Sequence, residues 1–188
     1  MLFLGFVNAV ETPEIYEEEV FVPTTVVEDI QEDWGIPFLH RDFVGFKEAL
    51  AFKESQGKYR AINTLGYLGK YQFGETTLER FRIYNMDAFL KNPELQEKAF
   101  AAYCRVNKWI LRKDIKRSVG KVINGVKITE SGILAAAHLS GAGNVKKYLR
   151  SHGNFNKSDA YGATIAMYIK KFADYDVSEI EAERLAKV

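Results

Sequence analysis

A glutamate near the end of a predicted helix is the strongest candidate for acid–base chemistry in this chain. Apolar residues recur at steps of three and four over residues 43–54, which predicts an amphipathic helix. Asp42 suits the N-cap and Gly57 suits the left-handed position after the C-terminus, so Glu54 falls in the last turn. Carbonyl groups there carry partial negative charge and favour the protonated form of a nearby carboxyl. Glu54 is therefore a candidate general acid.

The stretch that follows mixes glycine with aromatic residues. Four glycines and four rings lie between residues 57 and 74, a composition typical of tight turns that carry exposed ring faces. Such faces suit the binding of sugars, and they equally suit a hydrophobic core.

Three motifs in the expected order carry a family resemblance. Glu-Ser-x-Gly at residues 54–57, then Asn-x-x-Gly-x-x-Gly-x-Tyr-Gln-Phe at residues 63–73, resembles the first two motifs of the lysozyme-like lytic transglycosylases. Ala-His-Leu-Ser-Gly at residues 137–141 is similar to the third, Ala-Tyr-Asn-Ala-Gly, with His138 in place of Tyr and Leu139 in place of Asn. The pair Tyr168 and Ile169 resembles a fourth motif, in a late helix.

The resemblance implies an enzyme that cleaves the β-1,4 bond between N-acetylmuramic acid and N-acetylglucosamine in peptidoglycan. It makes Glu54 the general acid, as in the lytic transglycosylases and the phage-type muramidases. The side chains that it implies for the substrate-binding site, with Tyr168 supporting Glu54, are Ser55, Tyr71, Gln72, Phe73, His138 and Tyr168. Two of these have plain structural alternatives: Tyr71 as a core ring and His138 as a hydrogen-bonded structural histidine.

A second carboxylate would separate two chemistries. Hydrolysis usually adds one, whereas lytic transglycosylases resemble one another in using a single Glu and the substrate's own hydroxyl. Glu75 is the best candidate, because it follows the Gln-Phe motif and begins a helix, where an ionised carboxylate is favoured. Asp42 is a weaker candidate, and Glu75 is otherwise an ordinary first-turn residue. Lytic transglycosylase and hydrolytic lysozyme both remain open.

Charge is distributed unevenly along the chain. Residues 1–40 contain nine acidic residues and no Lys or Arg, which leaves 16 acidic and 26 basic residues in residues 41–188. We expect residues 1–40 to form an acidic arm that is either a solvated tail or a segment that docks on the basic domain or on a protein partner. The basic residues are scattered and match no nucleic-acid-binding motif, so we expect no nucleic-acid partner.

Several classes of site find no support in the sequence. The three His residues and the single Cys104 show no metal-ligand spacing, so we expect no metal and no cofactor, and Cys104 suits a buried core position. There is no run of eighteen apolar residues, and so no predicted transmembrane segment. Residues 1–10 resemble an incomplete signal peptide or an ordinary apolar segment.

The remaining pattern predicts a mostly α, α+β domain over residues 41–188, lysozyme-like, with a small β-hairpin at Asn124-Gly125. Further helices are predicted from residue 75 and over residues 87–90, 93–111, 133–140, 145–149, 161–172 and 178–188. Two functions from different classes follow. One is a peptidoglycan-cleaving enzyme of the cell envelope, the extracellular space or a phage or injection particle. The other is a weakly active or inactive lysozyme-like domain that serves cell-wall binding or particle assembly.

Overall fold

The computed structural model describes residues 40–188. The chain divides into two units, Met1–Asp33 and Trp34–Val188, and everything below lies in the second. The predictions about an acidic arm and an N-terminal signal concern residues that, apart from His40, lie outside the described ones.

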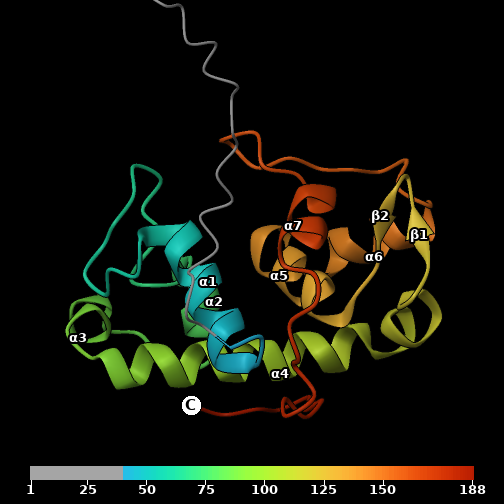
Figure 1. Ribbon diagram of the computed structural model, residues 1–188. Coiled ribbons are helices and arrows are strands. Elements are labelled where there is room, and N and C mark those ends of the chain that lie inside the picture. Colours follow the sequence, from blue (N-terminus) through green and yellow to red (C-terminus); the bar gives the residue numbers. More distant parts are fainter. Residues whose placement is uncertain (1–39) are drawn as a thin grey trace, which may run out of the picture. The chain divides into compact units, whose positions relative to one another are not determined.

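Residues 40–188 form seven helices and one two-stranded antiparallel sheet, which confirms a mostly α, α+β class (Figure 1). In chain order the elements are α1 (Phe43–Ser55), α2 (Glu75–Glu79), α3 (Met86–Leu90), α4 (Pro93–Ser118), β1 (Val122–Ile123), β2 (Val126–Lys127), α5 (Glu130–Ser140), α6 (Ala142–Arg150) and α7 (Ile165–Lys171). None of these helices combines the length and the apolar character needed to cross a membrane.

The ends of α1 are fixed locally. The side chain of Asp42 accepts a hydrogen bond from the Gly45 N–H at 2.9 Å, which caps the first turn. Gln56 (φ 57°) and Gly57 (φ 75°) are both left-handed and end the helix. Glu54 therefore lies in the last turn of α1, as the sequence predicts.

Helix α5 is the centre of the core. Residues 131–137 are all buried, and the helix packs against α4, α6 and α7. A Cβ atom at Gly132 would lie 2.5 Å from the carbonyl oxygen of Ile169, so glycine allows the close approach of α5 and α7. This packing brings the end of α5 and the side chains of α7 toward one site.

Two helix predictions need correction near α6 and α7. Helix α6 begins at residue 142 rather than 145, and α7 begins at residue 165 rather than 161. The side chain of Asp159 accepts hydrogen bonds from the Tyr161 and Ala163 N–H groups, and Gly162 has φ +84°. These side-chain contacts compete with helix formation, so residues 157–163 form a loop instead.

The predicted C-terminal helix over residues 178–188 is absent from the structure. Ile180 and Ala186 are buried, and the Glu183 N–H donates to the Arg105 carbonyl of α4 at 3.2 Å. A segment this short is marginal as an isolated helix, and here its backbone and apolar side chains are used against α4.

Candidate functional site

A cleft of about 320 Å³ opens beside the last turn of α1. Four segments contribute to it: the end of α1, the loop before α2, the end of α5 and the loop before α7. It is lined by Glu54, Asn63, Leu65, Tyr67, Gln72, His138, Leu139, Ser140, Lys157, Ser158, Asp159, Ala160 and Tyr161. Among the site residues predicted from sequence, the cleft brings together Glu54, Gln72 and His138.

Glu54 is paired with one neutral donor. The Tyr168 hydroxyl, from α7, donates a hydrogen bond to Glu54 Oε1 at 2.8 Å. Burial and then the Glu54 charge raise the pKa of Tyr168, so the phenol keeps its proton and remains a donor. No group in the described part of the chain donates to the other carboxylate oxygen of Glu54. Tyr168 is therefore placed to hold Glu54, and one carboxyl oxygen is left for a substrate.

His138 presents a neutral imidazole beside this carboxyl. Its Nε2 lies 2.8 Å from the Tyr71 carbonyl oxygen, and because that oxygen can only accept, Nε2 carries the proton. Burial lowers the pKa of His138, although the Glu54 charge and the Tyr71 carbonyl act in the opposite direction. Nδ1 is buried and has no hydrogen-bond partner among the described residues. Its lone pair is thus an unused acceptor on a side chain that lines the cleft.

Three predicted contact residues support the wall of the cleft from behind. The Ser55 hydroxyl donates to the Lys70 carbonyl at 2.7 Å, and the buried Tyr71 ring stacks on Phe100 with centroids 4.0 Å apart. Phe73 packs edge-on against His138 at 5.6 Å. The side chains of Ser55, Tyr71 and Phe73 do not line the cleft. The sequence motif therefore contains mostly residues that shape the loop.

Glu75 lies outside the cleft. It is exposed in the first turn of α2, where an acidic side chain suits the helix end. The structure does not bring it together with Glu54.

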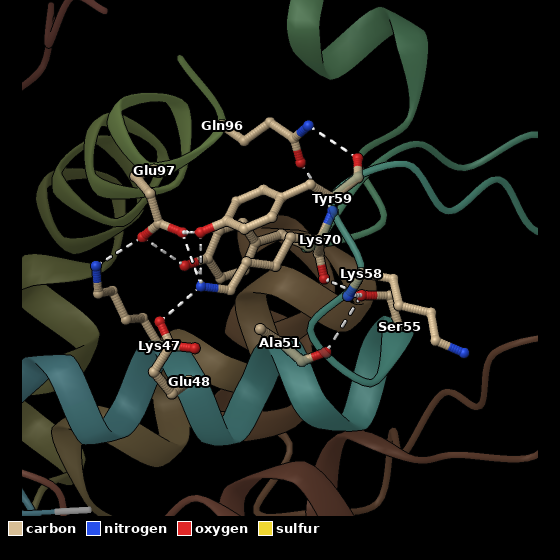
Figure 2. Close-up of polar contacts among 10 residues, drawn as sticks. Lys47, Glu48, Ala51, Ser55, Lys58, Tyr59, Lys70, Gln96 and Glu97 are labelled. Atoms are coloured by element: carbon tan, nitrogen blue, oxygen red, sulfur yellow. Dashed lines mark hydrogen bonds and ion pairs between the residues drawn. The ribbon is translucent and has the colours of Figure 1, made fainter. Parts of the chain in front are cut away.

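A second set of polar residues binds the loop before α2 to α1 and α4 (Figure 2). We call Lys47, Glu48, Tyr59, Lys70, Tyr71 and Glu97 the Glu97 cluster. Glu97 Oε1 accepts from Tyr59 at 2.9 Å and from Lys70 at 2.8 Å. Glu97 Oε2 accepts from Lys47 at 2.6 Å and from Tyr71 at 2.9 Å. All four donors to this carboxylate come from α1 or from the loop.

The charges in the Glu97 cluster compensate one another. Burial would raise the pKa of Glu97, but the hydrogen bonds from Lys47, Lys70, Tyr71 and Tyr59 outweigh it and lower the pKa to about 2. Burial would lower the pKa of Lys70, but hydrogen bonds to Glu48 and Glu97 raise it overall. The carboxylate and the ammonium both stay ionised over the ordinary pH range.

The side chain of Gln96 holds the same loop by hydrogen bonds to backbone groups. Its Nε2 donates to the Tyr59 and Phe89 carbonyls, each at 2.9 Å, and its Oε1 accepts from the Lys70 N–H at 2.8 Å. Gln96 is fully buried, so each of these bonds forms away from solvent.

Sequence reasoning missed the loop before α7. Asp159 and Tyr161 line the cleft, and the Tyr161 hydroxyl lies 2.9 Å from Thr64 Oγ1 in the facing loop. The signal was present, because Asp159 followed by Gly162 is typical of a turn. The Glu97 cluster carried no such signal, since two Lys, two Glu and two Tyr spread over residues 47–97 reveal nothing of their contact.

No model of a known protein family matches this chain, and neither a curated protein nor a solved structure matches it. In the part of the chain that the structure describes, no three His, Cys, Asp or Glu side chains are grouped to hold a metal ion. What the site offers is the Glu54 carboxyl, held by a phenol and flanked by a neutral imidazole, in a cleft that Asp159 also lines. That arrangement suits the donation of a proton to a bound substrate.

Proposed function

We propose that this chain cleaves the peptidoglycan glycan strand at the β-1,4 bond between N-acetylmuramic acid and N-acetylglucosamine, with Glu54 as the general acid. The observation that carries the proposal is the hydrogen bond from Tyr168 to one oxygen of Glu54 inside the cleft. The resemblance to lysozyme-like lytic transglycosylases and phage-type muramidases supports the choice of substrate. We infer from it a lysozyme-like fold for the domain.

The proposed reaction begins with proton transfer from Glu54 to the glycosidic oxygen. The bond between the anomeric carbon and that oxygen then breaks, and positive charge develops on the sugar ring. As Glu54 loses its proton it becomes an anion, and a hydrogen bond from a neutral donor is stronger to an anion than to a neutral carboxyl. The Tyr168 hydroxyl therefore stabilises the state in which the proton has left.

The cleft also suits the substrate. Tyr67 and Tyr161 are exposed rings on which sugar faces can lie. Lys157 can meet the carboxylate groups that peptidoglycan carries, and the excess of basic residues after residue 40 favours the same anionic polymer. The substrate places the enzyme in the cell envelope or outside the cell, or on a phage or injection particle.

The test is the rate of cleavage of purified peptidoglycan by wild type and by Glu54→Gln. We expect the variant to lose on the order of a hundredfold or more, because the amide cannot donate the proton. Glu79→Gln is the matched control, since Glu79 is exposed on α2 and lies outside the cleft. Equal rates for wild type and Glu54→Gln would contradict the proposal.

The second candidate function is a wall-binding or assembly component with little activity. The observation that favours it is the departure from the third motif, with His138 and Leu139 where the family has Tyr and Asn. In that case wild type would sediment with insoluble peptidoglycan and release no soluble fragments. We propose that the acidic arm, residues 1–40, then contacts a protein partner, which a pull-down with and without those residues would test.

A further inference from the structure

We propose that Asp159 is the second carboxylate of the cleft and that it activates a water molecule, which makes the reaction a hydrolysis. This inference rests on the proposed function of Glu54 and adds a role that the resemblance to lytic transglycosylases, which use a single Glu, does not predict.

Asp159 is held in place by the loop that carries it. Its Oδ1 accepts the N–H groups of Tyr161 at 2.9 Å and of Ala163 at 2.8 Å. Its own N–H donates to the Ala163 carbonyl at 2.9 Å. No described residue donates to Oδ2. One oxygen is therefore fixed by the backbone, and the other is available to a molecule in the cleft.

The loop itself is anchored at both ends. The Ala166 N–H donates to the Asn156 side chain at 3.0 Å, and the Ile165 N–H donates to the Lys157 carbonyl at 3.2 Å. At its tip, the Tyr161 hydroxyl meets Thr64 across the cleft at 2.9 Å. Asp159 is thus positioned before any substrate binds, which lowers the cost of orienting it during reaction.

Asp159 also lies near the groups around Glu54. It lines the same cleft as Glu54 and is partly buried there. Its charge contributes, after burial and the Glu54 charge, to the raised pKa of Tyr168. Glu75 has neither property, because it is exposed on α2 and does not line the cleft.

The step balances without any further reactant than water. Glu54 gives its proton to the glycosidic oxygen, and the bond from that oxygen to the anomeric carbon breaks. Water adds to the anomeric carbon and gives one proton to Asp159. One new sugar hydroxyl and one reducing end result. Solvent exchange then returns Asp159 to its ionised form and Glu54 to its protonated form.

The test compares wild type with Asp159→Asn in water enriched in oxygen-18. The Asn side-chain oxygen still accepts both backbone N–H groups, so the turn is kept and only the base is lost. We expect wild type to give reducing ends that carry the label. We expect Asp159→Asn to lose on the order of a hundredfold in kcat with a changed pH profile, and to keep the thermal midpoint of wild type. Glu79→Gln should behave as wild type.

Several outcomes would overturn the role of Asp159 and leave that of Glu54 intact. Unlabelled 1,6-anhydro ends from wild type would show that the substrate's own hydroxyl attacks. A wild-type rate and pH profile for Asp159→Asn would show that the carboxylate serves the turn alone. Loss of activity in Glu75→Gln with an active Asp159→Asn would assign the base to Glu75. Failure of the proposed function is distinct, since Glu54→Gln and wild type would then be equal.

Discussion

Two carboxylates of this domain, Glu97 and Glu54, are held in opposite ways. Glu97 accepts four hydrogen bonds, two of them from lysines, whereas Glu54 accepts one from a neutral phenol. A fully satisfied carboxylate with a pKa near 2 cannot act as an acid near neutral pH, but it can fix the elements around it. A carboxyl with one oxygen left open can transfer a proton. The number and charge of the donors therefore separate a structural carboxylate from a chemical one.

Tyr71 connects the Glu97 cluster to the cleft that contains Glu54. Its hydroxyl donates to Glu97, and its backbone carbonyl accepts from His138, which lines the cleft. The sequence motif places this tyrosine among substrate contacts, while its ring is fully buried. We interpret Tyr71 as the residue through which the Glu97 cluster positions His138 in the wall of the cleft.

The largest effect should come from removing the cation of the Glu97 cluster. Lys70→Met leaves Glu48 and Glu97 without their shared partner. Lys70 is buried, the two carboxylates are partly exposed and Glu97 keeps Lys47, so we expect a destabilisation of about 3 kcal/mol. Urea unfolding measures the free energy of unfolding. Lys98→Met is the control, because Lys98 pairs with Glu94 in solvent, and its urea midpoint should equal that of wild type. Equal midpoints for the two variants would mean that the Glu97 cluster contributes little.

The second-largest effect that we expect is the change in the free energy of unfolding with pH. The pKa of Glu97 is about 2 in the folded chain against an ordinary value of 4.5, so its contribution is present above pH 4.5 and is lost as the pH falls toward 2. Between neutral pH and about pH 3 this loss amounts to about 2 kcal/mol. Glu97→Gln should be less stable at neutral pH and should lose less on acidification. Parallel pH profiles of the two proteins would contradict the low pKa.

A smaller effect is expected from the single donor to Glu54. Tyr168→Phe removes one hydrogen bond to the carboxylate that forms during reaction, which should lower the cleavage rate about tenfold. Tyr148→Phe is the matched control, since the Tyr148 hydroxyl is buried with no partner among the described residues. Its removal should leave the cleavage rate unchanged and should not lower the stability, because the buried hydroxyl makes no hydrogen bond that would be lost. If the two variants cleave equally fast, Tyr168 does not support Glu54.

The smallest effect concerns the contact between the two loops of the cleft. Tyr161→Phe removes an exposed hydrogen bond to Thr64, and we expect KM to change by about twofold with kcat unchanged. Tyr84→Phe, on an exposed tyrosine outside the cleft, serves as the reference. An effect on kcat as large as that of Tyr168→Phe would mean that the contact positions the chemistry rather than the substrate.

Local signals in the sequence predict well the parts of the fold that depend on neighbouring residues. Asp42, Gly57 and the three- and four-residue spacing between them place Glu54 in the last turn of α1. Asn124-Gly125 predicts the hairpin, and the helix predicted from residue 93 begins there as α4, with Pro93 in its first turn. The predicted α7 begins four residues too early. The spacing of apolar residues does not show that the Asp159 side chain binds the backbone of its own turn.

The sequence by itself determined the position of Glu54 in the last turn of its helix, because helix caps and helical periodicity depend on residues only a few positions apart. The family resemblance implied that Tyr168 supports Glu54, and only the tertiary structure decided the geometry of that contact and which other groups lie near the acid. Tyr168 reaches Glu54 from 114 residues away, and Lys70 meets Glu97 across 27 residues. Asp159 enters the same cleft through the loop before α7, the helix that packs closely against α5 at Gly132. These encounters follow from the burial of apolar faces on several helices at once, and no short stretch of sequence contains that information.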